Sequence, residues 1–160
     1  MNVVNPTFLQ LLSKPIHLLA FGFGSGLFSR APGTAGTLVG VLFWFFLVDL
    51  SLTSYLTIVL IAALVGIYIC GKTATDLATH DHGGIVWDEI VGVLLAMSII
   101  PVTWTWVISS FLLFRLLDIW KPWPISWLDK NIGGGIGIMI DDMLAGAFTL
   151  AILYLVVEIL

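Results

Sequence analysis

The chain has 160 residues, of which 59% are apolar and only 10% are charged, and its formal net charge is −4. A soluble domain usually has about 25% charged residues, so this composition excludes an ordinary soluble globule and indicates an integral membrane protein. Six Lys and Arg residues are too few for a basic stripe, which excludes a nucleic-acid partner. From the length we expect one membrane-embedded domain covering residues 1–160.

The N-terminal part has two glycine-rich motifs. The apolar run 16–28 is interrupted by Gly22, Gly24 and Gly26, so we expect a short interfacial or re-entrant element there. The second motif, PGTAGT at 32–37, adds the hydroxyls of Thr34 and Thr37. Backbone N–H groups in such turns can bind anions, although either motif alone is more often a flexible connector.

Five apolar stretches are candidates for transmembrane helices, at residues 37–50, 54–71, 85–100, 103–120 and 137–160. Crossing the hydrocarbon takes about 20 residues, so the first stretch is short and the third reaches this length only if its acids are included. We predict an all-α polytopic membrane bundle of about five transmembrane helices. With this count, all basic residues fall on or near one side, which the positive-inside rule makes cytoplasmic.

Acidic residues concentrate in the third and fifth stretches, as the pairs Asp88–Glu89 and Asp141–Asp142. A carboxylate inside a membrane is costly and is functional by default, and carboxylate oxygens favour Mg²⁺ or Ca²⁺ over softer metals. The alternative is an acidic first helical turn stabilised by the helix dipole, which fits the first pair better than the second. The pattern predicts a divalent-cation site.

Small residues follow each acid pair at helical spacing. Gly92 and Ala96 follow the first pair, and Ala145 and Gly146 follow the second. Helices that approach closely need small residues at the contact. We therefore expect the acid-bearing faces to pack together.

Arg115, Asp118 and Lys121 recur at i, i+3 and i+6 near the end of the fourth stretch, which places them on one helix face. Arg binds phosphate with its planar fork and Lys binds it as a point charge, while Asp118 can ligate a metal or orient a base. The alternative is that both bases only snorkel to the interface. The motif HDHG at 80–83 places Asp81 and His82 in a loop on the same side, where they can assist proton transfer.

Together these residues resemble the phosphatidylglycerophosphatase A family of bacterial Mg²⁺-dependent membrane lipid phosphatases. The resemblance covers nearly the whole chain and rests on GFGSGL at 22–27, PGTAGT at 32–37, HDHGGIVWDE at 80–89 and FRLLDIWKPWPISWLDKNIGGGIGIMIDDMLAG at 114–146. It implies hydrolysis of phosphatidylglycerophosphate to phosphatidylglycerol and inorganic phosphate, at the cytoplasmic face of the bacterial inner membrane.

The residue pattern and the resemblance together give the expected roles. We expect three groups: catalytic Asp81, His82 and Asp118; Mg²⁺-ligating Asp88, Glu89, Asp141 and Asp142; and substrate-binding Arg115, Lys121, Thr34, Thr37 and Lys72. The competing hypothesis is a small divalent-cation channel or carrier that uses the same carboxylates.

Overall fold

The computed structural model describes residues 6–79 and 82–159, and every regular element in these ranges is helical. The prediction of an all-α fold is therefore confirmed for this part of the chain. The elements in chain order are α1 Phe8–Leu12, α2 Pro15–Ala20, the 3₁₀ helix η1 Gly22–Leu27, α3 Pro32–Leu47, α4 Leu52–Asp76, α5 Trp87–Ala96, α6 Trp104–Trp120, α7 Ile125–Asn131 and α8 Gly134–Ile159.

Two of the described helices are long and apolar enough to cross a membrane, namely α4 with 25 residues and α8 with 26. Helix α3 is apolar but shorter. Helix α5 has only ten residues, which at about 1.5 Å per residue gives about 15 Å, roughly half the thickness of a hydrocarbon core. A helix lies in each of the five predicted stretches, but the count of five membrane spans stays a prediction.

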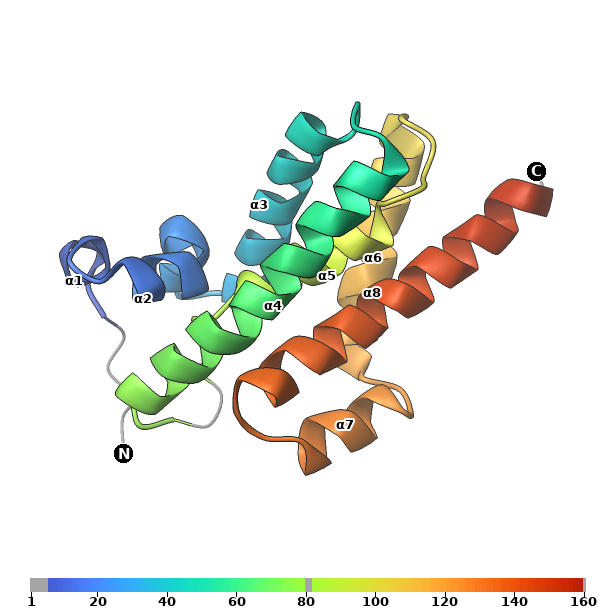
Figure 1. Ribbon diagram of the computed structural model, residues 1–160. Helices are drawn as coiled ribbons and strands as arrows, with labels where there is room; N and C mark the ends of the chain where they lie inside the picture. Colours follow the sequence, from blue (N-terminus) through green and yellow to red (C-terminus); the bar gives the residue numbers. More distant parts are fainter. Residues whose placement is uncertain (1–5, 80–81, 160) are drawn as a thin grey trace.

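The two long helices form the frame on which the rest of the molecule packs. In Figure 1, α4 and α8 run side by side, with α3, α5 and α6 behind them and α7 beside the beginning of α8. Gly135, near the start of α8, approaches the last turns of α4 so closely that a Cβ on it would lie 1.8 Å from the carbonyl oxygen of Ile67. The end of α4 therefore meets the beginning of α8.

Glycines also bring α5 into close contact with α8 and α3. A Cβ on Gly146 of α8 would lie 2.3 Å from the carbonyl oxygen of Gly92 on α5. On the other side, a Cβ on Gly40 of α3 would lie 2.4 Å from the side chain of Val93. Contacts this close are possible only without side chains, so the prediction that the acid-bearing helices pack together is confirmed.

The N-terminal element packs against the chain segment that precedes α5. In η1, Gly22, Phe23 and Gly24 all have positive φ angles, of 53°, 58° and 99°. The chain can then turn so that Gly26 lies against Gly84, where a Cβ would come within 1.9 Å of the Gly84 carbonyl oxygen. Gly22 and Gly26 of this irregular segment are buried, whereas Phe23 is exposed, and its re-entrant or interfacial position stays a prediction.

Candidate active site

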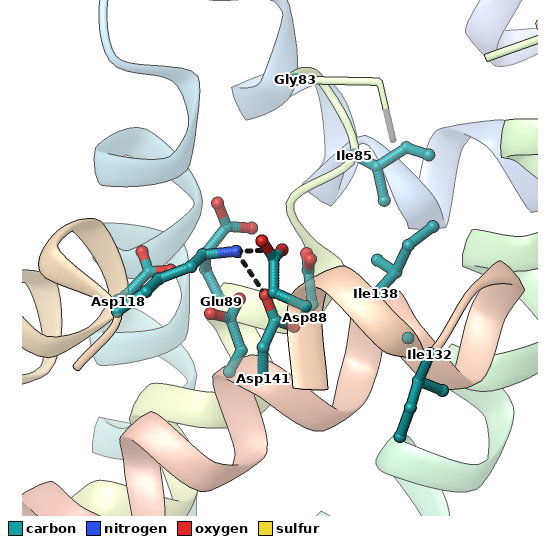
Figure 2. A pocket seen from close by; sticks show the side chains of 12 residues that line it. Gly83, Ile85, Asp88, Glu89, Asp118, Ile132, Ile138 and Asp141 are labelled. Carbon is teal, nitrogen blue, oxygen red and sulfur yellow. Dashed lines mark hydrogen bonds and ion pairs between the residues drawn. The ribbon is translucent and has the colours of Figure 1, made fainter. Parts of the chain in front are cut away.

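A cavity of about 130 Å³ lies where α5, α6, α7 and α8 meet. It has room for an ion with a few waters, since a water takes up about 30 Å³ in the liquid. Figure 2 shows Asp88, Glu89, Asp118 and Asp141 gathered across the cavity from Ile85, Ile132 and Ile138. Its ionisable lining residues are Asp88, Glu89, Asp118, Lys121, Asp129, Asp141 and Asp142.

Three carboxylates from two helices form the core of the site. Asp88 and Glu89 lie in the first turn of α5, and Asp142 comes from the third turn of α8. One oxygen from each of the three lies within 4.8 Å of the other two. Crowded carboxylates repel one another unless a cation or protons compensate the charge.

These carboxylates fit a hard divalent cation. Within the described part of the chain, no hydrogen-bond partner is found for the buried atoms Asp88 Oδ1, Glu89 Oε2 and Asp141 Oδ1. A buried polar atom normally has a partner, and oxygen atoms held close together are the ligands that Mg²⁺ and Ca²⁺ take. The acidic first turn of α5 is also stabilised by the helix dipole, so both sequence interpretations apply to Asp88 and Glu89.

Asp141 is near the three carboxylates but is held by a lysine. Lys121 Nζ donates to Asp141 Oδ2 over 2.5 Å and to Asp129 Oδ1 over 2.6 Å. Burial alone would lower the pKa of Lys121, but its hydrogen bonds to Asp129 and Asp141 outweigh burial and raise this pKa above its usual value. The ammonium therefore stays charged and keeps Asp141 paired beside the three-carboxylate cluster.

Arg115 forms the second cationic part of the site. Its Nη1 donates to Asp118 Oδ2 over 2.5 Å and lies 3.9 Å from Glu89 Oε1. The same nitrogen donates to Thr37 Oγ1 over 3.4 Å, and this hydroxyl donates in turn to Gly33 O over 2.8 Å. A Cβ on Gly33 would lie 2.3 Å from Glu89 Oε1. The PGTAGT motif therefore makes room for the Glu89 carboxylate and supplies one hydroxyl to the arginine.

Several predicted site residues lie apart from the cavity lining. Lys72 is exposed and forms an ion pair with Asp76. Thr34 is half-buried in the first turn of α3 and does not line the cavity. The His82 ring is buried, lies 5.4 Å from the Phe21 ring and accepts a hydrogen bond from the Gly84 N–H over 3.0 Å.

Asp81, predicted to be catalytic, lies outside the described residues. Conversely, Asp129 of α7 lines the cavity although the sequence does not predict it there, because in LDKN it resembles an ordinary solvated helix end. The close approach of Gly33 to Glu89 was not predicted either, because no spacing in the sequence indicates a contact between residues so far apart in the chain. The arrangement as a whole can hold a divalent cation and an anionic group side by side.

Comparison with known proteins assigns the chain to a family. The family model for phosphatidylglycerophosphatase A matches residues 18–157. The chain is 47% identical to phosphatidylglycerophosphatase A of Escherichia coli (strain K12), over 91% of this chain and 85% of that one. It is 45% identical to phosphatidylglycerophosphatase A of Haemophilus influenzae, over 94% of this chain and 93% of that one.

A third relative, from Bacteroides thetaiotaomicron, carries the provisional name phosphatidylinositol-3-phosphatase. It is 36% identical over 90% of this chain and 91% of its own length. No solved structure matches the chain. The family match spans the four helices that line the cavity, together with the Gly33–Thr37 motif. The chain belongs to the phosphatidylglycerophosphatase A family.

Proposed function

We propose that this protein hydrolyses phosphatidylglycerophosphate to phosphatidylglycerol and inorganic phosphate, with Mg²⁺ as its cofactor. One observation carries the proposal: three carboxylates with oxygens within 4.8 Å of one another share a cavity with Lys121 and lie beside Arg115. Carboxylates bind a hard cation, and Arg and Lys bind phosphate oxygens. Membership of the family and the names of the relatives from E. coli and H. influenzae support the choice of lipid.

The residues present fit Mg²⁺. Asp88, Glu89 and Asp142 would hold the ion, and the buried Oδ1 of Asp141 offers a further oxygen beside them. When bound, Mg²⁺ supplies positive charge that polarises the phosphate and lowers the pKa of a coordinated water. Without a cation, the same carboxylates would repel the phosphate dianion, so substrate binding and metal binding are expected to depend on each other.

The two bases would hold the phosphate group during hydrolysis. Arg115, oriented by Asp118, would donate to its oxygens, and Lys121 would add the charge of its ammonium. Positioning and charge stabilisation of this kind make up most of the catalysis in phosphoryl transfer. Water adds to phosphorus, the bond from phosphorus to the glycerol oxygen breaks, and this oxygen takes up a proton. Asp81 and His82 remain the proposed sources of that proton.

The membrane arrangement is part of the proposal. We place the site at the cytoplasmic face of the bacterial inner membrane, in a single domain of residues 1–160 with about five membrane spans. Two apolar helices of 25 and 26 residues support membrane embedding. Trp120, Trp123 and Trp127 are all exposed close to Lys121 in the chain, and exposed tryptophans are typical of the membrane–water interface. The channel or carrier hypothesis finds no support in the family match.

The proposal is tested with purified protein in detergent, given phosphatidylglycerophosphate with Mg²⁺ or with a chelator. We expect phosphate release with Mg²⁺ and almost none with the chelator. A folded preparation that releases no phosphate would overturn the proposed activity. Equal release with the chelator would overturn only the metal. Phosphatidylinositol 3-phosphate is tested as a second lipid, because one relative carries the provisional name phosphatidylinositol-3-phosphatase.

A further inference from the structure

Asp129 lies on the wall of the cavity, outside the set of residues that the sequence predicts for the site. It comes from α7, and its Oδ1 accepts a hydrogen bond from Lys121 Nζ over 2.6 Å. The same ammonium donates to Asp141 Oδ2 over 2.5 Å. The side chain of Asp141 is 8% exposed and that of Asp129 is 37% exposed. Lys121 thus bridges a buried carboxylate and one at the cavity's solvent side.

The backbone changes direction at this lysine. Lys121 ends α6 with φ 46° and ψ 59°, in the left-handed region. This left-handed residue ends the helix and turns the chain toward α7, and its side chain lines the cavity.

Asp129 is itself held in place by the packing of α7. Ile125, in the first turn of this helix, is fully buried. Beyond its end, the carbonyl oxygen of Ile132 lies against Gly137 of α8, where a Cβ would come within 2.0 Å of it. Both ends of α7 are therefore fixed against the rest of the molecule, and the Asp129 carboxylate has a defined place at the cavity.

We propose that Asp129 is a positioning residue for Lys121, which keeps the ammonium between the two carboxylates so that it can bind the phosphate of the substrate. An ammonium has three N–H donors, and Asp129 and Asp141 occupy two of them. Without Asp129, Lys121 would turn fully onto the buried Asp141 and leave the cavity's solvent side. This inference rests on the proposed function, because it assumes that Lys121 binds the phosphate of the substrate.

The competing explanation is an ion pair with no role in catalysis. Asp129 is more than a third exposed, and exposed ion pairs contribute little to stability. The Asp129→Asn variant should therefore fold under either explanation. If the pair has no role in phosphate binding, the variant should also keep wild-type kinetics.

A double-mutant cycle separates the two explanations. It uses Asp129→Asn, Lys121→Gln and the double variant, with Asp49→Asn as a matched control at an exposed acid of the α3–α4 turn. We expect Asp129→Asn to raise KM about three- to fivefold with kcat nearly unchanged. Lys121→Gln should raise KM about tenfold or more, because it removes a hydrogen bond to a charged group. The double variant should match Lys121→Gln, and Asp129→Glu should restore most of the affinity.

Two results would overturn the inference. One is an unchanged KM in Asp129→Asn, and the other is an equal fold-increase in KM from Asp129→Asn when Lys121 is already replaced by Gln. The affinity of all variants for inorganic phosphate in the presence of Mg²⁺ is measured in parallel, from the rise of Tm with phosphate concentration. This measurement needs no lipid turnover. If the wild type binds phosphate but does not hydrolyse the lipid, the proposed function fails, while the coupling between Asp129 and Lys121 is still decided.

Discussion

Gly146 of α8 lies directly against the backbone of Gly92 on α5, where a Cβ on Gly146 would come within 2.3 Å of the Gly92 carbonyl oxygen. This contact sets the separation of the two helices that carry the acid pairs. Asp142 lies one turn before Gly146, and Asp88 lies one turn before Gly92. The distance between their carboxylates therefore depends on a position at which no side chain fits.

The first prediction concerns this contact. Gly146→Ala should push α8 away from α5, lower the free energy of unfolding by about 1–3 kcal/mol, and abolish most Mg²⁺-dependent phosphate release. Ala151→Ser, which also adds one heavy atom to α8 but at an exposed position, should change neither. Thermal unfolding in detergent and the phosphate assay measure both effects. Full activity in Gly146→Ala would show that the helix separation is not critical.

The second prediction concerns metal binding by Asp142, measured without turnover. Asp142→Asn should raise Tm in the absence of Mg²⁺, because it removes one charge from a buried carboxylate cluster. Saturating Mg²⁺, at about 100 times its Kd, should stabilise the wild type by about 2.7 kcal/mol and the variant by far less. Tm with and without Mg²⁺ is the measurement, and Asp49→Asn is the control. A variant that responds to Mg²⁺ like the wild type would exclude Asp142 as a ligand.

The third prediction concerns the shape of the Arg115 side chain. Arg115→Lys keeps the positive charge but loses the planar guanidinium, whose Nη1 contacts Asp118 and Thr37. Because a hydrogen bond to a charged group contributes about 1.5–3 kcal/mol, kcat/KM should fall roughly tenfold to hundredfold. Steady-state kinetics on phosphatidylglycerophosphate measures this. If charge alone matters at this position, the lysine variant will retain nearly all activity.

The fourth prediction distinguishes the two lysines that the sequence assigns to substrate binding. Lys72 is exposed and paired with Asp76 outside the cavity lining, so Lys72→Ala should change kcat/KM by less than about twofold. Lys121→Ala should cause a much larger loss in the same assay, because Lys121 lines the cavity. Comparable losses of kcat/KM in both variants would show that Lys72 also takes part in substrate binding.

Much of the fold was predictable because apolar runs and small-residue spacing are local signals. The five apolar stretches each contain a helix, and the small residues after the acid pairs do form the contact between α5 and α8. The length of α5 was overestimated. Its apolar sequence continues to Ile100, but the helix ends at Ala96 and the chain turns before α6.

The acid pairs that meet at the site could be named from the sequence, but which side chains pair with one another could be predicted only within one helix. Arg115 and Asp118, three positions apart on α6, form the ion pair that their spacing indicates. Lys121 continues this spacing in the sequence, but it lies past the helix end with a positive φ and pairs with Asp129 and Asp141 instead. Helical periodicity cannot describe a side chain beyond the last helical residue, so these partners could not be derived from the sequence.

The carboxylate cluster on α5 and α8 is proposed to bind the metal that phosphate release requires. The most direct measurement is phosphate release from phosphatidylglycerophosphate by the wild type and by Asp88→Asn over a range of Mg²⁺ concentrations, with folding checked by Tm. Phosphate release should saturate with Mg²⁺ in the wild type and be almost absent in the folded variant. Wild-type release that is independent of Mg²⁺, or an active Asp88→Asn variant with the same Mg²⁺ dependence, would contradict this proposal.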